Sequence, residues 1–516
     1  MPCKIKRALI FALCAALCLS LSGCVSGVDA LQKKDTVTLP PAQVDYTAPT
    51  GDSNQEIVQS VLLYVPNAAR TRLIAQTDRI SISAARHPAE ATLRRLLAFS
   101  GNTEAAALCE GTTLALSSVN PVEISGDTAT VNLSASALTL SHSELYIVCQ
   151  AIADTLCQWG DIRYVNVLVS STQPGLDVGA SVPAGCFTAN YTDTLDALTA
   201  AAQTQSSAAA TSRFTLPVTL YYPAYSGKGI LAETRTLSFA GRNKATLITA
   251  LLAALSEGAQ TLENTPDMVD LASYLTEAPA VQEVAVSGGQ CAVLRFSRAF
   301  NDALITAGIP RSVMMASLTY TLTAFVPGIS GVTVYIGDEL VTAVVPGGTY
   351  TGAGESITFE NGLMRRSDFS IFLLSNCTLY FSDGAGHLMK VQRPIPYYET
   401  HSARYLINCL MQGPQPCDNA PDAQAVLPST LGDADLLGLG LSGTTLLMNL
   451  SAHALSEMSA VDARNEQIMV YAMVNTLSEP DGITGVCFFF NGEQRETLCG
   501  RVYWAGSFLK NMSIVE

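Results

Sequence analysis

Three short stretches of the chain repeat one phrase at nearly equal intervals. Each is an apolar run with a tyrosine in its middle, followed at once by turn residues: VLLYVPNAAR (61–70), VTLYYPAYSG (218–227) and CTLYFSDGAG (377–386). The tyrosines Tyr64, Tyr221 and Tyr380 are 157 and 159 residues apart. Because a domain takes roughly 150 residues, this spacing predicts three copies of one unit in the 516-residue chain.

The same succession of elements follows each tyrosine strand. A second extended stretch comes first, in RISIS (79–83), TRTLSF (234–239) and KVQRPIPYY (390–398). A segment of helical period follows, at 88–99, 244–258 and 402–413. A Ser-Gly turn then leads into a strand, within 124–134, 286–297 and 441–451. A second helix and a last strand complete each copy, at 143–157 and 164–170, at 311–325 and 331–337, and at 465–479 and 485–492.

A tail with one phenylalanine ends each copy, in PAGCF (183–187), RRSDF (365–369) and WAGSF (504–508). The pattern predicts an α/β (α+β) fold of three tandem β-β-α-β-α-β units, each a small mixed sheet with two helices packed on one face. The predicted domains are residues 56–190, 213–369 with an insertion at 340–362, and 370–516. An Ala/Thr/Ser-rich linker is expected at 191–212.

The N-terminal segment predicts export and a lipid anchor. Lys4, Lys6 and Arg7 precede an uncharged apolar run from Ala8 to Leu21, which is shorter than the about 20 residues that cross a bilayer and typical of a signal peptide. The run ends in Leu21-Ser22-Gly23-Cys24. This resembles the lipobox read by signal peptidase II, in which the cysteine is lipidated, and an ordinary signal peptide is the alternative.

These features predict a signal peptide at 1–23, a flexible tether at 24–55 and a protein held by membrane lipid at the extracytoplasmic face of the cell membrane. Of the fourteen cysteines, ten lie beyond Cys24. Their scattering favours small buried side chains. One or two disulfides are the alternative, with Cys487–Cys499 the first pair to check.

Neither the composition nor the motifs indicate a catalytic, cofactor-binding or metal-binding site. A net charge of −15 without a basic cluster beyond the leader argues against nucleic acid as a partner. GLGLSG (438–443) matches a dinucleotide fingerprint in letters, but it leads into a strand rather than a helix. The histidines stand in turns or at helix edges without metal-ligand spacing: His87, His142, His387, His401 and His453. We therefore expect no catalytic residue, metal or cofactor.

The candidates for protein contact are aromatic residues at unit edges. Tyr397, Tyr398, Tyr503 and Trp504 lie in turn or tail segments, and tyrosine and tryptophan are favoured anchors of protein interfaces. The alternative is that these rings pack against their own unit.

The succession of an L-Y-[FYV] strand, helix, S-G-x strand, helix and V-x-[VF] strand resembles the GerMN domain of GerM-like sporulation and spore germination lipoproteins. The resemblance covers most of residues 56–508. It implies a small α/β sandwich similar to the ring-building motifs of secretion systems and the sporulation channel. The first copy ends VLVSSTQPG and lacks the N-G-E or G-D-E turn of the others (491–493 and 337–339), so a difference is expected in its terminal hairpin. The family offers no catalytic residues to carry over.

The resemblance implies a non-enzymatic envelope lipoprotein whose repeats bind envelope or sporulation proteins during complex assembly, as a monomer, an oligomer or a ring. One alternative is a cell-wall or sensor-kinase accessory lipoprotein of vegetative cells. Another is a hydrolase whose site forms only in the fold.

Overall fold

The computed structural model describes residues 46–53, 56–177, 181–207, 212–284, 289–347 and 354–516. The predicted lipobox, Leu21 to Cys24, lies outside them. Residues Thr47 to Glu516 form one compact unit, to which the following description applies. Within the described residues, no helix has the length and apolar character needed to span a bilayer.

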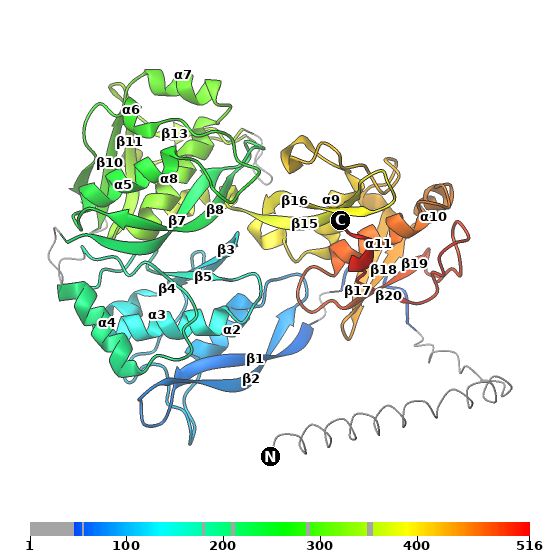
Figure 1. The fold of residues 1–516 in the computed structure, drawn as a ribbon, viewed down its shortest axis with the longest axis horizontal. Helices are drawn as coiled ribbons and strands as arrows, with labels where there is room; N and C mark the ends of the chain where they lie inside the picture. Colours follow the sequence, from blue (N-terminus) through cyan, green and yellow to red (C-terminus); the bar gives the residue numbers. More distant parts are fainter. Residues whose placement is uncertain (1–45, 54–55, 178–180, 208–211, 285–288, 348–353) are drawn as a thin grey trace, which may run out of the picture. The chain divides into compact units, whose positions relative to one another are not determined.

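Three successive groups of elements follow the chain (Figure 1). The first repeat contains β1 (Glu56–Pro66), β2 (Leu73–Ser83), α2 (Ala89–Leu97), β3 (Val122–Ser125), β4 (Thr128–Leu133), α3 (His142–Leu156), β5 (Tyr164–Val169) and β6 (Cys186–Phe187). The second contains β7 (Phe214–Pro223), β8 (Ile230–Phe239), α5 (Lys244–Ser256), α6 (Leu271–Tyr274), β9 (Ala280–Glu283), β10 (Gln290–Phe296), α7 (Ala299–Thr306), α8 (Arg311–Phe325), β11 (Ile329–Ile336) and the short strands β12 (Glu339–Leu340), β13 (Ala343–Val344) and β14 (Ile357–Thr358). The third contains β15 (Leu374–Ser382), β16 (Leu388–Pro396), η4 (Tyr397–Glu399), α9 (Ala403–Met411), β17 (Leu436–Ser442), β18 (Thr445–Leu450), α10 (Ala452–Ser459), α11 (Glu466–Leu477), β19 (Gly485–Phe490) and β20 (Ser507–Leu509).

Each repeat is built from a two-stranded antiparallel ribbon and a separate four-stranded sheet. The ribbons are β1-β2, β7-β8 and β15-β16, and the sheets have the orders β3-β4-β5-β6, β12-β11-β10-β9 and β17-β18-β19-β20. In every sheet one parallel pair joins the strands on either side of the second helix: β4 with β5, β10 with β11 and β18 with β19. The predicted mixed α/β class is confirmed.

The Ser-Gly phrase closes a hairpin in the first and third repeats, where a single strand was predicted after it. Ser125 pairs with Thr128 across Gly126, and Ser442 pairs with Thr445 across Gly443. Both glycines have positive φ, 59° and 62°, which a two-residue hairpin turn of this kind requires. Strands β3 and β17 therefore precede the turn. The predicted order β-β-α-β-α-β lacked these strands, β9 of the second repeat, and the short strands β6 and β20 in the tails.

In each repeat the tail pairs with the last strand. In the second repeat, however, the phenylalanine that the sequence aligned with the other two is not the residue that pairs. Phe187 pairs with Val165 and Phe508 with Val486. In the second repeat Val332, the residue corresponding to these valines, exchanges two backbone hydrogen bonds of 2.9 Å with Met364. Phe369 instead lies buried in a following 3-10 helix, Arg366–Phe372. The insertion before the tail hid this shift in the alignment.

The first repeat makes the same terminal turn as the third despite its different residues, so the expected difference from the third repeat is wrong. Val169 pairs with Thr172 as Phe490 pairs with Glu493. Ser170 and Ser171 adopt φ of 52° and 65°, a conformation that costs a side-chain-bearing residue free energy. The side chain of Asn132 accepts a 2.8 Å hydrogen bond from the Ser171 N–H, which stabilises the turn.

The second helix of each repeat holds the tyrosine ribbon through one recurrent hydrogen bond. In each of the three repeated apolar stretches, the backbone N–H of the tyrosine donates to a threonine hydroxyl: Tyr64 to Thr155 at 3.0 Å, Tyr221 to Thr321 at 3.0 Å and Tyr380 to Thr476 at 3.2 Å. All three threonines are fully buried on α3, α8 and α11. Each satisfies a backbone donor that a two-stranded ribbon leaves unpaired.

We expect Thr476→Val to lower the free energy of unfolding by about 1–3 kcal/mol, because the Tyr380 N–H loses its acceptor in a buried place. The measurement is urea unfolding followed by circular dichroism. Thr249→Val is the matched control, since Thr249 is an exposed helical threonine, and it should change the free energy by less than about 0.5 kcal/mol. Equal effects of the two substitutions would contradict the role of the bond.

Two predicted connecting segments carry more structure than expected. The linker at 191–212 contains helix α4 (Leu195–Ser207), which buries Leu195, Leu198 and Ala202 and contacts α3. Its apolar residues recur at i, i+3 and i+7, a spacing that the small-residue composition obscured. Residues 47–53, assigned to a flexible tether, lie against β17 through hydrogen bonds. The remaining domain boundaries stay predictions.

Every pair of repeats is in contact. Glu123 of the first repeat and Arg366 of the second form a buried ion pair, with Arg366 Nη2 2.6 Å from Glu123 Oε2. The amide of Asn264 in the second repeat donates to the Gln392 carbonyl of the third at 3.1 Å. The Ser125 hydroxyl of the first repeat donates to the Leu374 carbonyl of the third at 2.5 Å. The three repeats therefore form one body.

The ten cysteines beyond Cys24 are all free in the structure. Cys487 and Cys499, the first candidate pair, have other partners: the Gln494 amide lies 2.8 Å from Cys487 Sγ, and Cys499 Sγ lies 3.3 Å from the Met458 carbonyl. Burial raises the pKa of both thiols.

Candidate functional site

The structure separates the four aromatic interaction candidates. Tyr503 is 62 % exposed and Tyr398 is 45 % exposed, so both rings offer surface to a partner. Tyr397 packs partly against the core of the second repeat, with its ring centroid 5.5 Å from that of Tyr398. Burial raises the pKa of the Tyr397 hydroxyl.

Trp504 is removed from the interaction candidates because it is fully buried. Its ring lies among Phe488, Phe490 and Phe508 at centroid distances of 5.1–5.8 Å. Its indole Nε1 donates to Glu466 Oε1 at 2.9 Å. A tail tryptophan beside turn residues gave no signal of this burial, because the acceptor stands 38 residues earlier on α11.

Glu466 organises the loop before Trp504 from a fully buried position. It accepts hydrogen bonds from the backbone N–H groups of Cys499 at 2.9 Å, Arg501 at 2.7 Å and Val502 at 3.1 Å. Burial by itself would raise the pKa of this carboxyl. The hydrogen bonds from these groups and from Trp504 outweigh burial and hold the pKa below its usual value.

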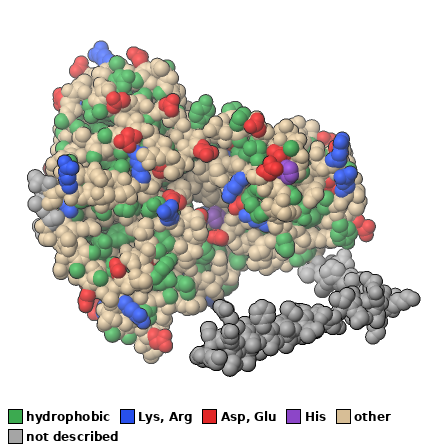
Figure 2. Space-filling model, in the orientation of Figure 1, with side chains coloured by type: hydrophobic (Ala, Val, Ile, Leu, Met, Phe, Trp, Pro, Cys, Tyr) green, Lys and Arg blue, Asp and Glu red, His purple; other side chains and the backbone are tan. Residues whose placement is uncertain are grey.

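A polar cavity of about 460 Å³ lies between the first and third repeats. Figure 2 shows a hollow near the middle of this face, with histidine and acidic side chains beside it. The lining includes backbone and side chains from both repeats: Ile124, Gly126, Gly160, Asp161, Ser375, Asn376, Cys377, Thr378, Lys390, Thr400, His401, Leu406, Glu479, Pro480 and Asp481.

His87 contacts two residues that line this cavity, Asp161 and His401, and has a defined tautomer. Its Nδ1 accepts the N–H of Ala89 at 3.0 Å, so Nε2 carries the proton and donates to Asp161 Oδ2 at 2.9 Å. Burial alone would raise the pKa of Asp161, but the His87 hydrogen bond holds it below its usual value. Burial and the nearby Asp161 raise the pKa of Asp481.

His401 is the buried histidine of the cavity, and its ring centroid lies 4.9 Å from that of His87. Burial and the neighbouring His87 lower the pKa of His401 to about 3, against the opposing effect of Asp161. The ring is therefore neutral at pH 7. Burial raises the pKa of the Cys377 thiol well above its ordinary value, so this lining thiol stays protonated and is a poor nucleophile.

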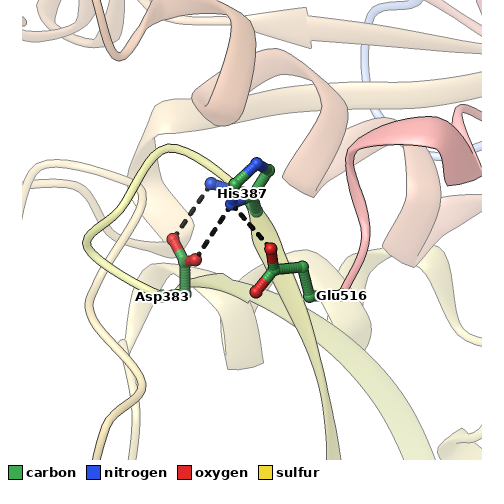
Figure 3. A group of neighbouring side chains, drawn as sticks. All are labelled: Asp383, His387 and Glu516. Carbon is green, nitrogen blue, oxygen red and sulfur yellow. Dashed lines mark hydrogen bonds and ion pairs between the residues drawn. The ribbon is translucent and has the colours of Figure 1, made fainter.

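A second cluster of titratable side chains lies at the β15–β16 turn. Figure 3 shows Asp383, His387 and Glu516 pointing toward one another. His387 Nδ1 is 3.2 Å from both Asp383 Oδ2 and Glu516 Oε1, and one ligand atom from each residue lies within 4.8 Å of the others. One imidazole and two carboxylates are ligands that divalent transition metals accept. A protonated histidine between two carboxylates accounts for the same distances.

Sequence reasoning missed both groups for a common reason. His87 and His401 stand 314 positions apart, and Glu516 is 129 positions from His387. No local motif links residues at such separations, so only the packing of repeats and the return of the C-terminal segment to β16 bring them together. The hydrogen bond from the Glu516 N–H to the Leu388 carbonyl, 2.9 Å, marks that return.

Comparison with known proteins identifies one family in all three repeats. The model of the Germane family, described as sporulation and spore germination, matches residues 62–173, 219–342 and 378–496, more than half of the chain. No curated protein matches the chain.

Several solved structures align with parts of the chain. The tandem GerMN domains of the sporulation protein GerM from Bacillus subtilis align at 16 % identity and a TM-score of 0.23, over 58 % of this chain and 100 % of that chain. The first GerMN domain of that protein aligns at 18 % identity and a TM-score of 0.22, over 26 % and 96 %. A putative lipoprotein from Clostridium perfringens aligns at 20 % identity and a TM-score of 0.19, over 27 % and 88 %.

Proposed function

Because the chain belongs to the Germane family of sporulation and spore germination proteins, we propose that it is a non-enzymatic, membrane-anchored envelope lipoprotein that assembles protein complexes. Its three GerMN-like repeats bind other proteins during sporulation or germination. Lipid on Cys24 holds the chain at the extracytoplasmic face of the cell membrane.

The observation that carries this proposal is the buried joint between repeats. Glu123 and Arg366 are 2 % and 3 % exposed and are bonded directly to each other. Tyr320 donates its hydroxyl to Glu123 Oε1 at 3.0 Å, and Arg366 Nη2 donates to the Tyr221 hydroxyl at 3.0 Å. A joint with these geometric demands fixes the first and second repeats in one arrangement. A body that presents several surfaces in a fixed arrangement suits a scaffold.

Exposed tyrosines on this body support protein binding. Tyr398 and Tyr503 combine a large apolar ring with a hydroxyl and cost little conformational entropy when a partner covers them. Both stand on the third repeat, Tyr398 two residues after the end of β16 and Tyr503 four residues before β20. We therefore place the partner surface on the third repeat.

A photo-cross-linking amino acid at Tyr398 or Tyr503 tests the proposal in cells taken through growth and sporulation. We expect cross-links to envelope proteins at these positions and only during sporulation. The matched control is Tyr225, an equally exposed tyrosine of the second repeat, 62 % exposed, which should give few cross-links. A Cys24→Ala chain should leave the membrane fraction and lose the cross-links.

Two results would overturn the proposal. Equal cross-linking from Tyr225 and Tyr503 would remove the assigned surface. Cross-links in vegetative cells to a sensor kinase or to wall enzymes would indicate an accessory role outside sporulation.

A further inference from the structure

The outer edge of β17 in the third repeat is occupied by residues 47–53, here called the strap. The Gly51 N–H donates to the Leu437 carbonyl at 2.9 Å, and the Ser53 N–H donates to the Leu439 carbonyl at 2.8 Å. The Leu439 N–H donates to Asp52 Oδ1 at 3.2 Å. The strap thus satisfies backbone groups that an edge strand otherwise leaves open.

Two glycines of β17 make room for this strap. A Cβ atom on Gly438 would lie 2.6 Å from the Gly51 nitrogen and 2.8 Å from the Pro49 carbonyl oxygen. A Cβ atom on Gly440 would lie 3.2 Å from Ser53 Oγ. The stretch that matched a dinucleotide fingerprint is therefore a recess for a peptide backbone. Opposite it, the Asn449 amide donates to the Pro49 carbonyl at 2.9 Å.

Arg404 on α9 gives the recess a charge preference. Its Nε and Nη2 donate to the two oxygens of Asp52 at 2.6 and 2.8 Å, while Nη1 donates to Asp433 at 2.7 Å. The Arg404 hydrogen bonds hold the pKa of the Asp52 carboxyl below its usual value. This paired geometry selects a carboxylate at one position of the bound segment.

The strap itself is held weakly. Thr50, Gly51, Asp52 and Ser53 are all exposed, so they bury little apolar surface. Their ion pair with Arg404 is accessible to water, and exposed pairs contribute little to stability. A segment of this kind is bound by a few backbone hydrogen bonds and is readily displaced.

The corresponding edge of the first repeat shows how such an edge is used. Strand β3 contacts β8 of the second repeat and β15 of the third. Ser125 on β3 accepts a hydrogen bond from the Ala232 N–H at 2.9 Å. In the first repeat this edge is therefore covered by other repeats, and in the third repeat the strap lies along it.

We propose that the β17 edge is a binding groove for an extended segment of a partner protein, in which a small residue followed by an acidic residue takes the places of Gly51 and Asp52. The strap fills the groove in the isolated chain and is displaced by the partner. This inference rests on the proposed function for the existence of a partner, but the groove is tested with purified protein and does not depend on sporulation.

The test uses the purified full chain and a fluorescent peptide with the strap sequence, YTAPTGDS (46–53). A Gly51→Pro, Asp52→Asn chain loses a backbone donor, a positive φ of 82° and the carboxylate, so its groove should open. We expect this variant to bind the peptide at least 10-fold more tightly than the wild type, whose own strap competes at an effective concentration on the order of millimolar. Fluorescence anisotropy gives the affinities, and hydrogen exchange at Leu439 reports release of the strap.

Two controls define the recognition. The peptide carrying Asp52→Asn should bind about 2- to 5-fold more weakly, because Arg404 loses its carboxylate. Gly438→Val added to the open variant should abolish binding, and its Cβ meets only strap atoms at closest approach, so the fold should persist.

Either of two outcomes would overturn the proposal. Fast exchange at Leu439 without peptide binding would show that the edge is not a groove for partners. Unchanged protection of Leu439 in the open variant would show that the strap is not displaceable. Failure of the cellular cross-linking with intact peptide binding would instead count against the proposed function alone.

Discussion

Replacement of Arg366 by methionine is expected to lower the free energy of unfolding by about 3–5 kcal/mol, because it leaves the buried carboxylate of Glu123 without its cation. The guanidinium also stacks over Tyr320, 3.8 Å from the ring centroid, and is hydrogen-bonded to Tyr221. The loss should appear in urea unfolding at pH 7. It should also increase hydrogen exchange in β3, which carries Glu123.

Arg298→Met is the matched control for this experiment. Arg298 pairs with Asp338 at 3.7 Å, but both side chains are exposed, at 79 % and 98 %, so the change should be about 0–1 kcal/mol. The double substitution Glu123→Leu, Arg366→Met should recover much of the lost stability, because it leaves no unpaired charge. A cost for Arg366→Met as small as that of the control would show that the joint does not hold the repeats together.

Glu466→Gln is expected to lower the free energy of unfolding by about 3 kcal/mol at pH 7. Glutamine keeps one acceptor oxygen, but its amide nitrogen replaces one carboxylate oxygen that faces two N–H groups. Loss of Oε2, for example, would leave the N–H groups of Arg501 and Val502 without an acceptor. The Trp504 fluorescence should change with it, since its indole donates to the same carboxylate. Glu496→Gln, an exposed position in the same loop, should change stability by less than about 0.5 kcal/mol.

The pH dependence of this difference has a defined sign. The pKa of Glu466 is lower in the folded chain than its usual value. The contribution of the Glu466 carboxylate to the free energy of unfolding is therefore complete above the pKa of the unfolded state, and it is lost as the pH falls through the folded-state pKa. The difference in the free energy of unfolding between the wild type and Glu466→Gln should narrow as the pH falls below the range in which glutamate side chains usually titrate. A gap that widens in acid would contradict the assigned hydrogen bonds.

The repeated elements could be predicted from the sequence because local patterns specify them. The helix expected at 311–325 is α8, residue for residue. Pro310 before it and Pro327-Gly328 after it are local sequence signals for the start and the end of a helix. The strands before the Ser-Gly turns were missed because VEIS and LLGLGLS are short or glycine-rich, and neither alternates clearly between apolar and polar residues.

The contacts between repeats could not be predicted from local patterns. Glu123 and Arg366 are 243 positions apart, and a glutamate in a short strand reads as a solvated side chain. Asp52 and Arg404 are 352 positions apart. Trp504 looked like surface because its acceptor, Glu466, belongs to a helix that the tail meets only after folding. Such pairs form because whole repeats pack against each other, and the spacing of residues along the sequence does not reveal that packing.

Contacts between parts of the chain that are far apart in sequence set the order in which it can finish folding. In a linear repeat array each unit touches only its neighbours and can fold as soon as it is made. Here Glu123 has no counter-charge until Arg366 has emerged, and the strap has no edge to pair with until β17 exists. Residues near the start of the compact unit are thus among the last to reach their native contacts, and a chain truncated before β17 leaves the strap without its partner strand.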